Sequence, residues 1–424
     1  MLSRKVLWKK IPPNTFVIHI SLSPNVERDD VAQAAYALLR GGFLRKEGKR
    51  VHELTSELST YFDGADVFLT NSGRSAMVTI LRALGVGEGD EVIIQAFNCN
   101  AVVNPLLWVG ATPRYADIDE TYNSDPSYVE SLITPKTRAI VAQHTFGMPA
   151  QLDMLRAIAD KHNLVLIEDC AHALGARYED ETVGLVGDVA FLSFGRDKVI
   201  SSVYGGAIVA SGHYTARIVK EYEMVRYPGT LWTLQQLVHP IITSFARAIF
   251  PLGALILVGA QRAKVLSKAV SVGERFGKKP EVFPARLPDA LAGLALHQFK
   301  KLERFNAHRR AIAALYEEEL FGVEGVELPK PPRGSIFLRY PIQCANPKGL
   351  RSFVRARGFV LGDWYANILD PVGTDMRAMG YEAGMCPRAE EASAHVVNLP
   401  THILIHEEKA KELAGLIKEF CSRP

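Results

Sequence analysis

The sequence is short of three features that mark common classes of protein: net charge, paired cysteines and an unbroken apolar run of membrane-spanning length. Its 49 Lys and Arg residues against 46 Asp and Glu residues leave a formal net charge of only +3. That balance predicts small-molecule partners and no nucleic-acid surface. The five cysteines are odd in number and form no CxxC pair, which disfavours a disulfide framework or a zinc ribbon; they are Cys99, Cys170, Cys344, Cys386 and Cys421.

No secretion signal is expected at the start of the chain. Residues 1–14 include basic side chains, but Pro12 and Pro13 interrupt the segment before an apolar core of signal-peptide length develops. Together with the cysteine pattern, this favours a cytoplasmic protein.

The spacing of apolar residues predicts an α/β fold. With 424 residues and 48% hydrophobic content, the chain is long enough for two or three cooperating units. Residues 29–39 are expected to form an amphipathic helix that stops at Gly41 and Gly42. Between residues 91 and 211, short apolar runs alternate with helical or polar stretches; the runs are 91–94, 139–142, 164–167, 189–192 and 207–210. This pattern predicts a mostly parallel central sheet with helices on both faces and a site at the carboxyl ends of its strands.

The pattern changes after Pro288. The apolar spacing predicts one long helix over residues 291–320. Strands are expected at residues 336–342 and 359–361, and a closing helix at residues 407–420. The C-terminal part should therefore form a smaller α+β domain.

A candidate anion site lies at residues 71–77, between a predicted strand (67–70) and a predicted helix (75–84). The unpaired N–H groups and positive dipole end of a helix amino terminus bind phosphate, Gly73 lets the backbone approach closely, and Ser75 adds a hydroxyl. Arg74 lies in the same loop. An ordinary helix cap is the alternative interpretation.

Two further residues follow predicted strands. Asp169 ends the apolar run 164–167, where a carboxylate suits the protonated nitrogen of a pyridine cofactor. Lys198 follows the run 189–192, where an amine of lowered pKa would attack an aldehyde. Each residue also has an alternative interpretation: Asp169 as a hydrogen-bonded carboxylate at a strand end, and Lys198 as an ordinary surface lysine.

The order of phosphate loop, strand-end aspartate and later lysine resembles the DegT/DnrJ/StrS family of sugar aminotransferases, which share the fold of aspartate aminotransferase (fold type I). The resemblance covers residues 29–416. Its motifs are Asn-Ser-Gly-Arg-Ser-Ala at 71–76, Gly-Ala-Thr-Pro-Arg-Tyr-Ala-Asp-Ile-Asp at 110–119, Ile-Thr-Pro-Lys-Thr-Arg at 133–138, His-Thr-Phe-Gly-Met-Pro-Ala at 144–150, Glu-Asp-Cys-Ala-His at 168–172, Ser-Phe-Gly-Arg-Asp-Lys at 193–198, Cys-Pro-Arg-Ala-Glu at 386–390 and Asn-Leu-Pro-Thr-His at 398–402.

The resemblance implies a set of roles around pyridoxal 5'-phosphate (PLP). Asp169 meets the pyridine nitrogen, and His172 lies beside the ring. Ser193 binds the phosphate, and Lys198 holds the cofactor aldehyde and moves the α proton. The implied catalytic residues are Lys198, Asp169 and His172; the implied cofactor-binding residues are Gly73, Arg74, Ser75, Cys99, Asp169, His172, Ser193 and Lys198.

The implied reaction moves an amino group, from glutamate by resemblance, to a keto sugar that is linked to a nucleotide or to a lipid. Relatives that replace the lysine are dehydratases, so Lys198 favours amino transfer. A homodimer is expected, with loops of one subunit helping to bind ligands of the other. The expected layout is an N-terminal arm (1–28), a large PLP-binding domain (29–222), an apolar helical insertion (223–288), and a long helix with a small C-terminal domain (289–424).

Three positions depart from the family pattern. Cys99 stands where many relatives stack an aromatic side chain on the cofactor ring, so stacking must be weaker or come from elsewhere. Asp197 replaces the usual threonine before the lysine, and we expect it to point away from the amine, toward Arg196. Val203 and Tyr204 replace a Gly-Glu pair, which indicates a remodelled sugar pocket.

Residues 227–260 form the clearest departure, because they are strongly apolar and Arg247 is the only residue among them that is charged at neutral pH. Pro240, Arg247 and Pro251 interrupt the stretch, which argues against a membrane-spanning helix. The favoured interpretation is a pair of buried helices that cover the partner subunit or lid the active site.

The other interpretation is a peripheral membrane contact through residues 227–262, at the inner face of the membrane, which would suit a lipid-linked sugar. Trp232 and Phe250 would then be apolar anchors. The anionic headgroups would meet a set of downstream basic residues: Arg262, Lys264, Lys268, Arg275, Lys278 and Lys279.

Two alternative functions stay open. One is a PLP-dependent lyase or dehydratase on a sugar; the other is a non-catalytic sensor or scaffold with the same fold. No metal site is expected, because no HExxH frame surrounds His402 and His406.

Overall fold

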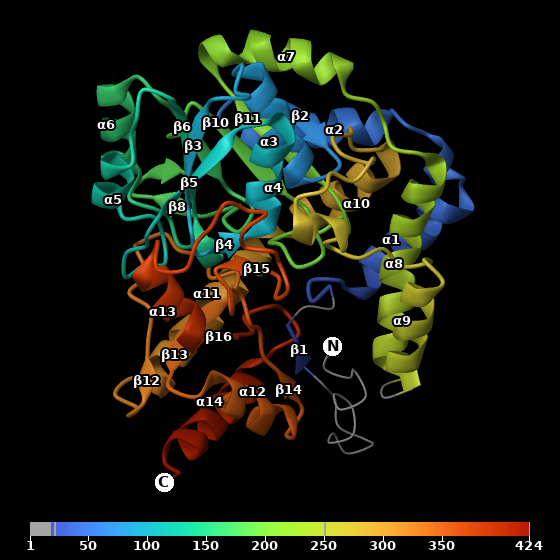
Figure 1. The fold of residues 1–424 in the computed structure, drawn as a ribbon. Coiled ribbons are helices and arrows are strands. Elements are labelled where there is room, and N and C mark those ends of the chain that lie inside the picture. Colours follow the sequence, from blue (N-terminus) through green and yellow to red (C-terminus); the bar gives the residue numbers. More distant parts are fainter. Residues whose placement is uncertain (1–17, 21–22, 250–251, 424) are drawn as a thin grey trace.

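A computed structural model describes residues 18–20, 23–249 and 252–423 (Figure 1). Residues 1–17 of the predicted N-terminal arm lie outside this part, as does Phe250. The central sheet has seven strands, in the order β2 (Asp66–Thr70), β11 (Gly206–Ala210), β10 (Val189–Ser193), β7 (Val165–Asp169), β6 (Thr137–Gln143), β3 (Glu91–Gln95) and β5 (Thr112–Ala116). β11 runs antiparallel to β2 and β10 on either side of it, and the other four pairings in this sheet are parallel. The prediction of a mostly parallel sheet is confirmed.

Successive side chains of a strand point to opposite faces, and both faces of this sheet are covered. On β10, Phe191 packs in the same apolar cluster as α3 (Gly73–Ala83) and α4 (Asn100–Val109). Its neighbour Leu192 packs in the opposite cluster, with α2 (Lys49–Tyr61) and α10 (Asp289–Phe299). The other helices around the sheet are α1 (Arg28–Leu39), α5 (Pro126–Ser131), α6 (Leu152–His162) and α7 (Thr215–Met224). Helices on both faces are thus confirmed.

The C-terminal part has its own antiparallel sheet, of β12 (Val326–Glu327), β13 (Tyr340–Cys344) and β16 (Val396–Leu399). It shares an apolar core with α11 (Leu302–Leu320), α12 (Pro347–Arg355) and α14 (Glu407–Cys421). The helix α13 (Pro387–His395) instead packs into the core of the large sheet.

Short strand pairs complete the fold: β1 (Ile18–His19) with β14 (Phe359–Val360), β4 (Asn98–Cys99) with β15 (Leu369–Asp370), and β8 (Arg177–Tyr178) with β9 (Glu181–Thr182). The pair β4–β15 joins the C-terminal part of the chain to the segment that carries Cys99.

Two predictions about the C-terminal part are wrong in detail. The expected long helix is interrupted after Phe299, where the Lys301 N–H turns to the Gln298 oxygen and a new helix begins at Leu302. The strand expected over residues 336–342 begins only at Tyr340. Its first residues pair with a loop instead, because Ile336 and Leu338 donate to the carbonyls of Gly147 and Phe146.

The apolar stretch forms two antiparallel helices, α8 (Thr230–Ala248) and α9 (Leu252–Arg262), which lie along one side of the molecule beside α1 (Figure 1). Gly253 allows them to approach closely, since a Cβ there would lie 1.8 Å from the Ala246 oxygen. One side of this pair is buried and the outer side is exposed in the single chain. That the pair covers a partner subunit or lids the active site stays a prediction. Within the described ranges, no helix is both long enough and apolar enough to cross a membrane.

Candidate active site

A pocket lies where β7 and β10 end and α3 begins. Seven of the eight predicted cofactor-binding residues line this one cavity: Gly73, Arg74, Cys99, Asp169, His172, Ser193 and Lys198. The eighth, Ser75, does not line it. Parallel strands deliver their carboxyl ends to one sheet edge, which is why residues far apart in sequence converge here.

Ser75 lies beneath the phosphate loop rather than in the pocket wall. It is fully buried, its hydroxyl donates to Asn71 Oδ1 at 2.5 Å, and it accepts from the Ala285 N–H at 3.1 Å. The pocket instead receives Ser72, whose Oγ caps α3 by accepting from the Ser75 N–H at 3.1 Å. Sequence reasoning missed Ser72, although its place just before the helix was a signal for a cap.

Arg74 carries a charge that is already neutralised. Its guanidinium pairs with the buried carboxylate of Glu274, donates to the Ala269 carbonyl at 3.0 Å, and lies 4.4 Å from the centre of the Phe283 ring. Arg74 therefore fastens a segment of the insertion over the phosphate loop. Its side chain does not offer a free cation to an anionic ligand.

Asp169 is a buried carboxylate at the end of β7. Its Oδ1 accepts from the Ala171 N–H at 2.9 Å, and no other described residue hydrogen-bonds to the carboxylate. Burial raises the pKa of this group, opposed first by the Ala171 hydrogen bond and then by the charge of Lys198. Such a group gains from a cationic partner, as a protonated pyridine nitrogen would be.

Lys198 lies in the same pocket with its pKa lowered, mainly by burial, while Asp169 acts in the opposite direction. The main chain at Lys198 is held by Asn25, whose Nδ2 donates to the Lys198 carbonyl at 2.8 Å. A lowered pKa keeps more of the amine neutral, which is the nucleophilic form.

His172 is neutral and has a defined hydrogen-bonding role. Burial, followed by the charges of Lys198 and Arg339, lowers its pKa well below the usual value. Its Nδ1 faces the Phe146 N–H at 3.3 Å, so Nδ1 accepts and the proton lies on Nε2. The imidazole therefore offers one donor.

Cys99 is a neutral thiol in the pocket wall, with its pKa raised to about 11, chiefly by burial. An aromatic surface comes instead from the C-terminal part, through Trp364 and Tyr365. The centre of the Trp364 ring lies 5.2 Å from Lys198 Nζ. Sequence reasoning missed both aromatic residues, because no recognisable motif near them indicates that they line a pocket.

Asp197 was expected to point toward Arg196, but the two side chains form no ion pair in the described part of the chain. Arg196 binds Ser267 instead, through its carbonyl at 2.7 Å and its hydroxyl. Burial raises the pKa of Asp197 to about 6, while Arg339, Arg196 and Lys198 act in the opposite direction.

Tyr204 explains part of the remodelled pocket. Its hydroxyl donates to the Lys268 carbonyl at 2.5 Å, and its ring packs edge-on against Trp232. Arg74, Arg196 and Tyr204 thus hold residues 267–274 of the insertion against the pocket, and Ala269 lines it.

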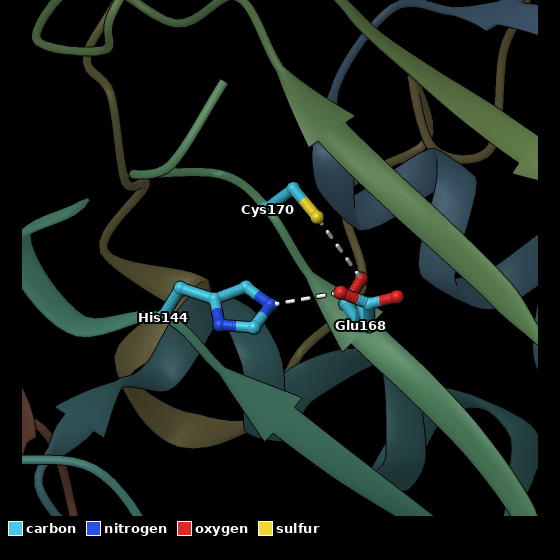
Figure 2. Close-up of side chains that lie close together, drawn as sticks. All are labelled: His144, Glu168 and Cys170. Atoms are coloured by element: carbon cyan, nitrogen blue, oxygen red, sulfur yellow. Dashed lines mark hydrogen bonds and ion pairs between the residues drawn. The ribbon is translucent and has the colours of Figure 1, made fainter. Parts of the chain in front are cut away.

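A cluster of potential metal ligands lies behind the pocket, formed by His144, Glu168 and Cys170 (Figure 2). The atoms of Glu168 and His144 that could bind a metal already take part in hydrogen bonds. Glu168 accepts from the N–H groups of Gly184 at 2.8 Å and Gly187 at 2.6 Å and from His144 Nε2 at 3.2 Å, while His144 Nδ1 accepts from the Ala150 N–H at 3.0 Å. These contacts fix the loops next to Asp169, and the absence of a metal remains a prediction.

Comparisons with known proteins agree with this geometry. UDP-N-acetyl-3-dehydro-alpha-D-glucosamine 3-aminotransferase of Acidithiobacillus ferrooxidans is 29% identical over 82% of each chain. L-glutamine:2-deoxy-scyllo-inosose aminotransferase of Micromonospora echinospora is 35% identical over 61% of this chain and 54% of its own. The crystal structure of Streptomyces venezuelae DesV in complex with a ketimine intermediate superposes with a TM-score of 0.73 at 26% identity, over 93% of this chain and 95% of that one.

The model of the DegT/DnrJ/EryC1/StrS aminotransferase family matches residues 25–418, nearly the whole chain. Since both the sequence match and the strand-end pocket agree, this protein belongs to that family and is a PLP-dependent aminotransferase.

Proposed function

We propose that the enzyme transfers an amino group from glutamate to the ketone of a nucleotide-linked sugar. The observation that carries the proposal is the meeting of Lys198 and Asp169 in one pocket, each with a pKa shifted by burial and each acting on the other through its charge. Perturbed groups of opposite charge in a cavity are typical of catalytic sites.

The residues present fit PLP. The first N–H groups of α3, beginning at Gly73, and the Ser193 hydroxyl, which hydrogen-bonds to no described residue, would bind the phosphate. Asp169 would pair with the pyridine nitrogen, and His172 would donate from Nε2 beside the ring. When bound, the cofactor supplies an electron sink for negative charge on the carbon that bears the amino group.

Lys198 would carry the proton transfers. As a neutral amine, Nζ would accept the proton from the α-carbon of the donor and later return a proton to the carbon that receives the amino group. The lowered pKa of Lys198 supports this role, because a fully charged ammonium cannot accept a proton.

The nature of the substrate is supported by the names of relatives. One acts on a UDP-linked keto sugar, and another transfers from glutamine to a keto cyclitol that carries no nucleotide. We therefore propose a nucleotide-linked keto sugar as the acceptor, with a lipid-linked sugar as the alternative, and we keep glutamate as the donor to be tested against glutamine.

We also propose a cytoplasmic homodimer in which each subunit contributes loops to the other's site. The cytoplasm is supported by the cysteines, all five of which are free. Gel filtration or light scattering that finds only monomers would contradict the dimer.

The reaction is tested with PLP-loaded enzyme, each donor in turn, and UDP- and dTDP-linked keto sugars. Glutamate alone should release 2-oxoglutarate only up to the number of active sites, and catalytic release should require the keto sugar, which gains an amine by mass spectrometry. Loss of water or ammonia without consumption of a donor would indicate a lyase, and no turnover with any acceptor would favour the scaffold interpretation.

A further inference from the structure

The α8–α9 hairpin and the segment that follows it have an unusual charge pattern. From residue 224 to residue 273 there is no Asp or Glu, while five Lys and Arg residues occur: Arg226, Arg247, Arg262, Lys264 and Lys268. The rest of the chain mixes the two signs nearly evenly. A stretch of 50 residues whose charged side chains are all positive favours contact with an anionic surface.

The inner side of the hairpin is firmly packed. Leu237 is fully buried in the core around α10, and Trp232 packs against Tyr204. Trp232 is therefore an internal contact, not the outward anchor that the sequence suggested. This packing means that the outer side of the hairpin has a defined shape without any partner.

The outer side displays large apolar residues to solvent. The exposed fractions are 80% for Leu231, 73% for Leu255, 66% for Leu252 and 57% for Phe245. Val265, which follows α9, is 42% exposed. Scattered apolar side chains are ordinary on a surface, but four large apolar residues, each more than half exposed on two adjacent helices, favour an interaction site.

Three cations lie next to this apolar surface. Arg262 ends α9, and Lys264 and Lys268 follow it; all three are exposed, and none forms an ion pair with any residue in the described part of the chain. Arg247 is different, since it turns inward and donates to the Val26 carbonyl. The three exposed cations are thus free to meet negative charge from outside the molecule.

We propose that this surface docks the enzyme on an anionic lipid bilayer. The apolar residues would enter the boundary between headgroups and acyl chains, and Arg262, Lys264 and Lys268 would meet lipid phosphates, with the helices lying along the membrane. A second copy of the chain fits less well, because a two-fold contact through the same face would bring the two cationic sets toward each other. The proposal does not depend on which sugar the enzyme aminates.

Docking would place the membrane close to the active site. Lys268 is exposed to solvent, yet its carbonyl accepts from the Tyr204 hydroxyl in the pocket wall, and the next residue, Ala269, lines the pocket. A sugar attached to a membrane lipid would therefore have a short path to the cofactor pocket.

The experiment is co-flotation of the full-length holoenzyme with vesicles of phosphatidylcholine alone or mixed with phosphatidylglycerol. We expect binding to the mixed vesicles only, reduced by salt. Leu252→Glu/Leu255→Glu should abolish it. Arg262→Gln/Lys264→Gln/Lys268→Gln should weaken it on the order of 100-fold, because each basic residue near an anionic surface contributes about fivefold. Phe321→Glu, at a residue that is 79% exposed in the C-terminal part, is the matched control and should bind like the wild type.

A second control addresses the other basic segment of the chain. This segment is residues 4–10, with Arg4, Lys5, Lys9 and Lys10. A variant with glutamine at all four of these positions should float like the wild type. Wild-type protein that fails to float with anionic vesicles would overturn the proposal. So would equal flotation of the leucine variant, or a leucine variant that floats normally but changes from dimer to monomer, which would assign the surface to a second copy.

Discussion

The indole of Trp364 lies parallel to the imidazole of His172, with 5.3 Å between ring centres and 7° between ring planes. Its face also meets the guanidinium of Arg339, whose central carbon lies 3.3 Å from the ring centre. Trp364 thus brings an aromatic surface from the C-terminal part into the pocket wall that also contains Cys99. Trp364 could therefore supply the aromatic contact with the cofactor ring that Cys99 cannot provide.

Replacing Trp364 by alanine should weaken cofactor binding. Loss of one aromatic contact of about 0.5–1.5 kcal/mol corresponds to a roughly 2- to 12-fold higher Kd. Equilibrium titration of the apoenzyme with PLP measures it, with Trp364→Phe as the control that keeps a ring. Cys99→Phe in the alanine background should recover part of the affinity, and unchanged Kd values across the set would show that Trp364 does not face the cofactor.

Two adjacent carboxylates should give opposite results when each becomes an amide. Asp169→Asn should lower kcat roughly 100-fold or more, because the pyridine nitrogen loses its charged partner, while the free energy of unfolding falls little or rises. Glu168→Gln should instead lower the free energy of unfolding by about 1–3 kcal/mol, since two buried N–H groups and His144 lose their charged acceptor.

Steady-state kinetics and urea unfolding on the same samples separate the two roles. If Glu168→Gln abolished turnover while stability stayed unchanged, the assignment of Glu168 as a structural residue would be wrong.

His402 should make the protein sensitive to acid. Its Nδ1 accepts from the Leu404 N–H, and burial, followed by nearby positive charges, lowers its pKa to about 3. Because the unfolded chain binds this proton near pH 6.5 and the folded chain does not, stability is fully present above pH 6.5 and is lost as the pH falls. The loss from this one group is roughly 2 kcal/mol by pH 5.

The measurement is urea unfolding from pH 8 to pH 5, compared with His402→Asn, whose amide oxygen can accept the same N–H. The variant should show a shallower loss of stability below pH 6.5. Parallel pH profiles for the two proteins would contradict the assignment.

Much of the pocket could be predicted because its residues belong to short motifs at strand ends. Asp169, Ser193 and Lys198 follow apolar runs, and a parallel sheet brings such ends together without further information. Ser75 was expected in the pocket, but Ser72 lines it instead. A helix cap and a phosphate loop use the same residue types. Motif position alone does not say which hydroxyl faces inward.

The missed features depend on contacts between distant parts of the chain. Trp364 and residues 267–274 reach the pocket only after the C-terminal part and the insertion have folded back, and no local pattern encodes that. The break after Phe299 was hidden because α10 and α11 continue one apolar spacing. Ile336 and Leu338 have the composition of a strand, yet their partners are loop carbonyls.

The most direct test is the visible absorption spectrum of purified protein with PLP, recorded beside Lys198→Ala before and after glutamate is added. Wild-type enzyme should show the band of lysine-bound cofactor, the variant should lack it, and glutamate should convert the wild-type band to that of the pyridoxamine form. A wild-type protein that stays colourless with added PLP, or an alanine variant with the same band and the same response, would contradict the role of Lys198.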